Sequence, residues 1–288
     1  MGAITRRAVQ ANGVDFHLLE AGSGPLALCL HGFPDTAHTW RHLLPALARA
    51  GFHAVAPFQR GYAPSSVPDD GRYQSGVLAA DADALHDVLG GDGDAVVIGH
   101  DWGAAGAHGA AVLSPERWRR VVTMAVPPGP ALGAALLGDL AQLKRSWYMF
   151  FFQTPFAEMI VSARDHAFID MLWRDWSPGF APDTDEVKRS LADGAHLSAA
   201  LGYYRATLGN GLRDPALEQA QVATQEYPTQ PLLYLHGRND GCVGVSVVEA
   251  ARSTMPAHVD VRVIDGAGHF LHLEHPDLVE QHILGFLT

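Results

Sequence analysis

The stretch that decides the fold is Gly99-His100-Asp101-Trp102-Gly103. An apolar run, 95–98, leads into it, and a helical stretch rich in alanine and glycine, 103–111, leads out of it. A strand, a sharp turn and a helix in this order place the central side chain at the edge of a sheet in a strained conformation. Glycine two residues before and after the centre leaves room for the chain to fold back. This spacing is typical of a nucleophile elbow, and its centre here is Asp101 rather than serine.

Short apolar runs recur on both sides of this elbow. They lie at 26–30, 53–58, 120–126, 231–235 and 259–264. Runs of this length that alternate with helical patterns indicate strands buried on both faces of a parallel sheet. A hairpin is predicted before them over 7–22, with its turn at Ala11-Asn12-Gly13. The sequence therefore predicts an α/β protein with a doubly wound, mostly parallel sheet.

The alternating rhythm stops between residues 130 and 229, where the patterns are mainly helical and rich in Trp, Tyr, Phe and Met. This insertion leaves the core after the strand that follows the elbow. Because ligands bind at the carboxyl ends of the strands in such sheets, we expect the insertion to cover that edge as a helical cap. The predicted organisation is a core of residues 1–129 and 230–288 with a cap of residues 130–229.

Composition and charge exclude several classes of partner. The chain has 288 residues and a net charge of -11, and its 20 Lys and Arg residues are scattered. We therefore expect no nucleic acid partner and no anionic membrane partner. No uncharged apolar run reaches the roughly 18 residues that a membrane span needs.

Cysteines and histidines give no sign of a metal or a disulfide framework. Cys29 lies within an apolar strand and Cys242 lies in a predicted loop. Their spacing favours a reducing compartment, and we expect a cytoplasmic protein. None of the 16 histidines falls in a metal-type motif. The sequence therefore predicts neither a metal nor an organic cofactor.

Three polar residues directly follow predicted strands, namely Asp101, Asp240 and His269. Their order of nucleophile, acid and base is that of α/β-hydrolases. Asp240 is placed to accept one ring proton of His269 and so to fix its tautomer. The competing position for the acid, 126–130, holds no carboxylate. Helix or turn capping is the alternative interpretation for Asp240.

An aspartate at the elbow changes the chemistry. An ionised carboxylate needs no base to become nucleophilic, and it displaces leaving groups from sp³ carbon to give an ester. His269 is then free to activate water, and the backbone N–H groups of Phe33 and Trp102 are the predicted oxyanion hole. This pattern favours epoxides or alkyl halides over carboxylic esters as substrates.

The sequence resembles the epoxide hydrolases of the α/β-hydrolase fold at four motifs. These are His31-Gly32-Phe33-Pro34, Gly61-Tyr62, the elbow and Gly268-His269. The resemblance implies conversion of an epoxide to a vicinal diol through an ester on the elbow aspartate. The aromatic stretch from Trp147 to Phe152 favours a small apolar or aromatic epoxide, which we expect to bind beside His31, Pro34, Trp102 and Phe152.

The family also uses two cap tyrosines to protonate the epoxide oxygen. Tyr148 and Tyr204 match those positions, and the adjacent Tyr203 is the alternative for the second. After Gln153 the chain reads Thr154-Pro155-Phe156, where many relatives have a Pro-Gly pair. This departure weakens the match within the cap. A neutral phenol can donate a hydrogen bond to the ring oxygen as its C–O bond breaks.

Three other functions compete with this interpretation. A haloalkane dehalogenase would share the nucleophile and the base, and the indole N–H of Trp102 would suit a halide. However, Phe33 stands where that family commonly has asparagine, and the tyrosine pair has no use there. A fluoroacetate dehalogenase would need an arginine in place of Trp102. A ligand-binding protein on this fold would have lost part of the triad, whereas all three members are present.

Overall fold

The computed structural model describes residues 3–181, 183–209 and 211–288. Within these residues the strands form one eight-stranded sheet in the order β1-β2-β4-β3-β5-β6-β7-β8. The strands are β1 (Thr5–Ala11), β2 (Val14–Gly22), β3 (Leu26–Leu30), β4 (His53–Pro57), β5 (Ala95–His100), β6 (Trp118–Met124), β7 (Leu232–Gly237) and β8 (Val259–Ile264). β2 runs antiparallel to β1 and β4, and the other pairs are parallel. The predicted hairpin and mostly parallel sheet are confirmed.

Helices cover both faces of this sheet. The core helices are η1 (Ala37–Arg41), α1 (Leu43–Arg49), α2 (Ser75–Val88), α3 (Trp102–Leu113), α11 (Val245–Ala251), α12 (Leu271–Glu274) and α13 (Pro276–Leu287). Alternate residues of β5 face opposite layers. Val96 and Ile98 pack with side chains of α1 and α13, whereas Val97 packs with side chains of α2 and α3. A central strand therefore has apolar residues on both of its faces, which explains its continuous apolar run.

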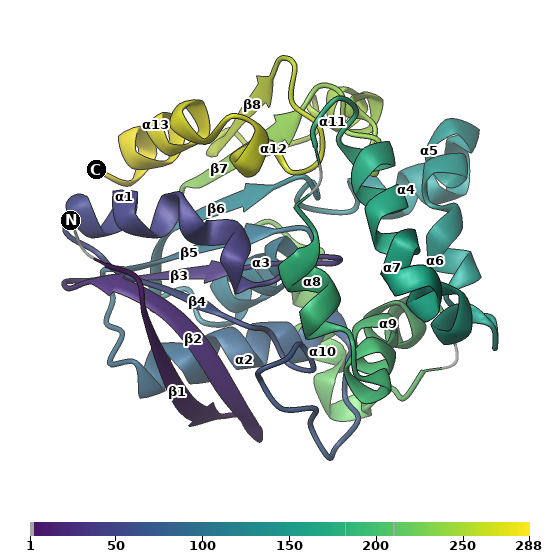
Figure 1. Cartoon of the computed structure of the whole chain (residues 1–288). Coiled ribbons are helices and arrows are strands. Elements are labelled where there is room, and N and C mark those ends of the chain that lie inside the picture. The colour runs from purple at the N-terminus through teal and green to yellow at the C-terminus, as the bar shows by residue number, and fades with distance from the viewer. Residues whose placement is uncertain (1–2, 182, 210) are drawn as a thin grey trace.

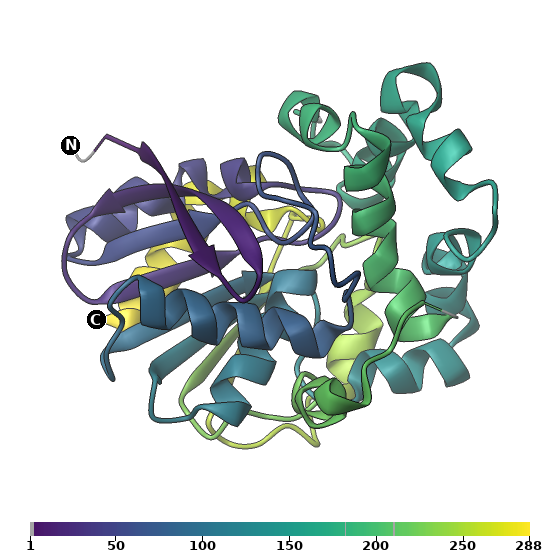
Figure 2. The same ribbon diagram turned by 90° about the horizontal axis from the view of Figure 1, so that it is seen from below.

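The segment between β6 and β7 begins with six helices within the described residues. They are α4 (Ala131–Gly138), α5 (Leu140–Arg145), α6 (Trp147–Phe151), α7 (Ala157–Trp176), α8 (Asp185–Ser190) and α9 (Gly194–Leu208). The turn η2 (Pro215–Leu217) and α10 (Glu218–Ala223) follow, and α10 packs against α2 and α3. Figures 1 and 2 show α4 to α9 gathered beyond the carboxyl ends of the strands. These six helices, called the cap below, cover the edge where the elbow lies.

An aromatic cluster joins the cap to the core. Tyr148, Phe152 and Tyr204 of the cap pack in one buried group with Phe33 and Phe270 of the core. Asp139 and Asp193 cap the N-termini of α5 and α9, where their carboxylates accept hydrogen bonds from the first-turn N–H groups.

Along the stretches that the structure describes, no helix combines the length and the apolarity that crossing a bilayer demands.

Candidate active site

The elbow between β5 and α3 has the strained geometry that its sequence predicts. The backbone of Asp101 has φ +54° and ψ -119°, a conformation that residues other than glycine rarely adopt. A Cβ atom at Gly99 would overlap the carbonyl of Gly103, and one at Gly103 would overlap the carbonyl of Leu30. Both flanking positions therefore require glycine. The turn leaves the Asp101 carboxylate buried at the carboxyl edge of the sheet, beneath the cap.

Asp240 and His269 meet this carboxylate from the loops after β7 and β8. His269 Nδ1 lies 3.0 Å from Asp240 Oδ2, and the other oxygen of Asp240 accepts hydrogen bonds from the N–H groups of Cys242 and Val243. Asp240 thus uses one oxygen to cap its turn and the other to contact the imidazole of His269. His269 Nε2 faces Asp101 Oδ2 at 3.7 Å. The structure brings the three predicted triad residues together.

The charges of this group shift the pKa values of the nucleophile and of the imidazole. Burial raises the pKa of Asp101. This effect of burial exceeds the lowering effects of His269 and of the N–H groups of Phe33 and Trp102. Burial would lower the pKa of His269, but attraction to Asp240, with a smaller contribution from Asp101, raises it overall. The imidazole is therefore stabilised in its charged form, which is the form that a general base reaches after it accepts a proton.

The two oxygens of Asp101 have different surroundings. Oδ1 accepts a hydrogen bond of 2.8 Å from the backbone N–H of Phe33. Oδ2 faces His269 instead. One predicted oxyanion-hole donor, the N–H of Phe33, thus already contacts Oδ1, which leaves Oδ2 as the candidate nucleophilic atom.

The cap places two phenols beside this carboxylate. The rings of Tyr148 and Tyr204 lie 5.7 Å apart, and Tyr204 lies 5.1 Å from the Trp102 indole. The Tyr204 hydroxyl has no hydrogen-bond partner within the described residues. The Tyr203 hydroxyl, by contrast, donates to the carbonyl of Arg60 at 2.7 Å. Burial, followed by nearby groups that include Asp101, raises the pKa of Tyr148 and Tyr204 well above 10, so both hydroxyls keep their protons.

Of the predicted pocket residues, Phe152 packs against both phenols. Its ring is 5.1 Å from that of Tyr204 and 5.4 Å from that of Phe33. Pro34 is buried, and its carbonyl accepts a hydrogen bond from the Trp173 indole. A cavity of about 170 Å³ borders Trp102 and Tyr204, with mainly apolar side chains around it.

The ring of His31, a predicted pocket residue, is held by backbone groups on both of its nitrogens. The N–H of Gln59 donates to His31 Nε2 at 3.0 Å, and Nδ1 lies 2.9 Å from the carbonyl of Gly32. Because both ring nitrogens are bonded to backbone, neither is free for a ligand. The His31 ring therefore supports the turn that carries Phe33.

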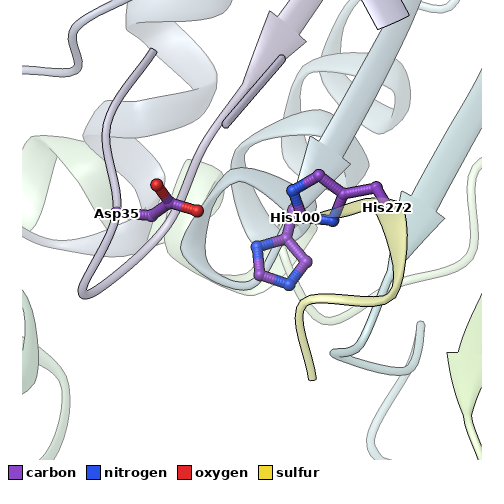
Figure 3. A group of neighbouring side chains, drawn as sticks. All are labelled: Asp35, His100 and His272. Carbon is purple, nitrogen blue, oxygen red and sulfur yellow. The ribbon is translucent and has the colours of Figure 1, made fainter. Parts of the chain in front are cut away.

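A second polar cluster lies behind His269, formed by Asp35, His100 and His272 (Figure 3). The Asp35 carboxylate faces the two imidazole rings, and ligand-type atoms of the three residues lie within 4.8 Å of one another. His100 Nε2 donates to the backbone carbonyl of His269 at 2.9 Å. Burial lowers the pKa of His272 to about 3 and raises that of Asp35 to about 7. Burial also lowers the pKa of His100 well below 6.5, so a neutral imidazole braces the backbone of the candidate base.

Two groups of metal-ligand side chains occur among the described residues, and sequence patterns identify neither of them. One is the cluster behind His269, and the other consists of Asp101, Cys242 and His269. Their members are far apart in the chain, so no short motif exists. The sequence indicates these residues only by their position, because Cys242 stands two residues after the candidate acid and His100 stands directly before the candidate nucleophile.

Known proteins match this chain over nearly its whole length. The family model for the alpha/beta hydrolase fold matches residues 25–276. The chain is 31% identical to epoxide hydrolase A of Mycobacterium tuberculosis, over 100% of this chain and 98% of the relative. It is 30% identical to epoxide hydrolase 3 of the mouse, over 97% of this chain and 75% of the relative.

Solved structures give the same result. The crystal structure of epoxide hydrolase A from Mycobacterium thermoresistibile superposes with a TM-score of 0.79 and 29% identity, over 99% of this chain and 98% of that one. These matches span the core and the cap alike. The chain belongs to the epoxide hydrolase family of the α/β-hydrolase fold.

Proposed function

We propose that this protein hydrolyses epoxides to vicinal diols through a covalent ester on Asp101. The observation that carries the proposal is the pair of buried phenols beside an elbow aspartate. Tyr204 has a hydroxyl without a partner in the described part of the chain, and it lies against Trp102 and Tyr148. A phenol in this position suits an epoxide oxygen, which needs a proton as its C–O bond breaks.

In the first step, Asp101 Oδ2 attacks an epoxide carbon. The C–O bond of the ring breaks, a C–O bond to Asp101 forms, and the ring oxygen takes a proton from Tyr148 or Tyr204. Oδ1 stays on the N–H of Phe33 and becomes the carbonyl oxygen of the ester. The mainly apolar cavity beside Trp102 supports a small apolar or aromatic substituent on the substrate.

In the second step, His269 Nε2 removes a proton from water, and the oxygen of that water attacks Cγ of Asp101. Asp240 stabilises the imidazolium through its 3.0 Å contact to Nδ1. The N–H groups of Phe33 and Trp102 stabilise the oxyanion, and each such donor typically contributes about 3–4 kcal/mol. Collapse releases the diol and regenerates the Asp101 carboxylate, and the proton held by His269 restores the phenol.

Dehalogenation is the second candidate, because one observation favours it. Trp102 Nε1 is buried without a partner in the residues described, and an indole N–H can bind a departing halide. The phenols weigh against it, since a halide leaves without a proton. Phe33 also offers a ring rather than an amide at the neighbouring position.

Two substrates separate these functions. The purified protein is incubated with styrene oxide and with bromobutane, and diol and bromide are measured independently. We expect diol without bromide. Bromide without diol would overturn the proposal in favour of dehalogenation.

A single turnover in ¹⁸O-labelled water tests the ester. The proposal expects the label in the Asp101 carboxylate and none in the first diol released. Label in the diol with none in Asp101 would indicate direct attack by water on the epoxide.

A further inference from the structure

The loop after β7 brings a thiol into the candidate active site. Cys242 Sγ lies 3.3 Å from the Tyr148 hydroxyl, and the side chain is buried. Ligand-type atoms of Cys242, Asp101 and His269 all lie within 4.8 Å of one another. The proposed hydrolysis gives this sulfur no chemical role, yet it contacts one proposed acid and neighbours both the nucleophile and the base.

Sulfur, nitrogen and oxygen from these residues form a ligand set that thiophilic cations prefer. Cysteine, histidine and aspartate all bind Zn²⁺, and a site with three protein ligands keeps a fourth position for water. Ligand atoms around a tetrahedral zinc ion lie roughly 3.5 Å apart, given its usual bond lengths. His269 Nε2 and Asp101 Oδ2 are already 3.7 Å apart. The separation of these two atoms is therefore close to the one that a tetrahedral zinc ion requires.

His269 supplies an independent indication of a ligand. Its Nε2 atom is buried and has no hydrogen-bond partner in the described residues. Because Nδ1 bonds to Asp240, a neutral ring carries its lone pair on Nε2, where a cation would sit. A carboxylate behind a metal-binding imidazole also orients the ring and raises its basicity. Asp240 therefore serves a bound cation in the same way as it serves the base.

We propose that Asp101, Cys242 and His269 form an inhibitory site for a thiophilic divalent cation, Zn²⁺ or Cd²⁺. Binding forms a bond between the metal and Sγ, releases the thiol proton to solvent and breaks the contact with Tyr148. No change of oxidation state is involved. The inhibition rests on the proposed function, because the cation occupies the nucleophile and the base and so excludes the substrate. The binding itself does not depend on that function.

A binding measurement tests the site without any reference to activity. Cd²⁺ is added to the full-length protein, and the ultraviolet charge-transfer band of a thiolate–cadmium bond is recorded. We expect one band that saturates at one ion per chain and is lost in Cys242→Ser. Cys29→Ser is the matched control, because Cys29 is the other cysteine of the chain and lies in β3 within the core. It should keep the band.

His269→Gln tests the imidazole and does not depend on the stability of a cysteine variant. Loss of this ligand should weaken Cd²⁺ binding by at least about tenfold, since removing even an outer-shell partner typically costs that much. Unchanged affinity in His269→Gln would overturn the site. So would the absence of a band in the wild-type protein, or a band that survives Cys242→Ser.

The inhibitory consequence is measured with the epoxide substrate. Cd²⁺ and Zn²⁺ should raise the apparent KM and leave kcat unchanged, and a chelator should restore activity. In Cys242→Ser, half-inhibition should need at least about tenfold more cation, relative to that variant's own metal-free rate. Equal inhibition of both proteins would overturn the proposal. A band in a protein without epoxide hydrolase activity would support the cation site and overturn the proposed function alone.

Discussion

Removing one hydroxyl from each of two adjacent tyrosines should give opposite results. The Tyr204 hydroxyl has no partner in the described residues, so Tyr204→Phe leaves no protein group unsatisfied. The Tyr203 hydroxyl donates to the buried carbonyl of Arg60 at 2.7 Å, and Tyr203→Phe would leave that carbonyl without its donor. The first substitution should therefore affect catalysis, and the second should affect stability.

Magnitudes follow from these contacts. An unsatisfied buried acceptor costs about 1–3 kcal/mol, so Tyr203→Phe should lower the free energy of unfolding by that amount. General acid catalysis contributes roughly 10²–10⁴-fold, and Tyr148 remains in Tyr204→Phe. We therefore expect the lower end, a fall of about 10²-fold in ester formation, or about 2.7 kcal/mol in the barrier.

The assay pairs single-turnover ester formation from styrene oxide with urea denaturation of the same preparations. Tyr204→Phe should show the slow step at wild-type stability, and Tyr203→Phe should show the reverse. The reasoning is refuted if Tyr203→Phe forms ester slowly at unchanged stability while Tyr204→Phe reacts normally. In that case Tyr203 would be the second acid.

Three further predictions concern the base, its carboxylate and a buried ion pair. His269→Gln should form the Asp101 ester and then stall, so mass spectrometry should detect one stable adduct per chain, and sustained turnover would contradict the role of the base. Because attraction to Asp240 raises the pKa of His269 above 6.5, ester hydrolysis should slow as pH falls through a value above 6.5. Asp240→Asn should move this acid limb to lower pH while it slows the step, and an unmoved limb would exclude Asp240 as the cause. Asp81→Ala would remove both 2.7 Å contacts of the buried Arg60 guanidinium, which should cost about 3–5 kcal/mol in urea unfolding, and a loss near zero would contradict the pairing.

The polar residues at strand ends could be predicted because parallel strands end at one edge. The apolar runs identify the strands, and the residues that follow them must then gather at that edge. Asp101, Asp240 and His269 come from three such ends, and the structure brings them within contact distance. The glycine spacing of the elbow was equally informative, because steric overlap at Gly99 and Gly103 excludes any side chain.

Contacts between the cap and the core could not be predicted in this way. Tyr203 and Tyr204 are adjacent on α9, so only the seating of that helix decides which hydroxyl meets the Arg60 carbonyl. The contact between Cys242 and Tyr148 likewise depends on how the cap packs on the core, because Cys242 lies in a loop without a recognisable motif. His272 becomes a buried neighbour of His100 only because α12 packs under η1. These placements depend on tertiary packing, which local patterns do not encode.

The contacts of the Asp101 carboxylate indicate which groups assist each of the two proposed steps. The N–H of Phe33 already holds Oδ1, which stabilises the carboxylate before it reacts and so gives little help to its attack on carbon. The same donor becomes effective when charge develops on the ester oxygen in the second step. In the proposed mechanism, ester formation then depends on proton donation from Tyr148 or Tyr204 to the departing oxygen. Loss of a phenol should therefore slow ester formation alone, whereas loss of His269 should slow ester hydrolysis alone. A substitution at either position that slowed both steps would contradict this division.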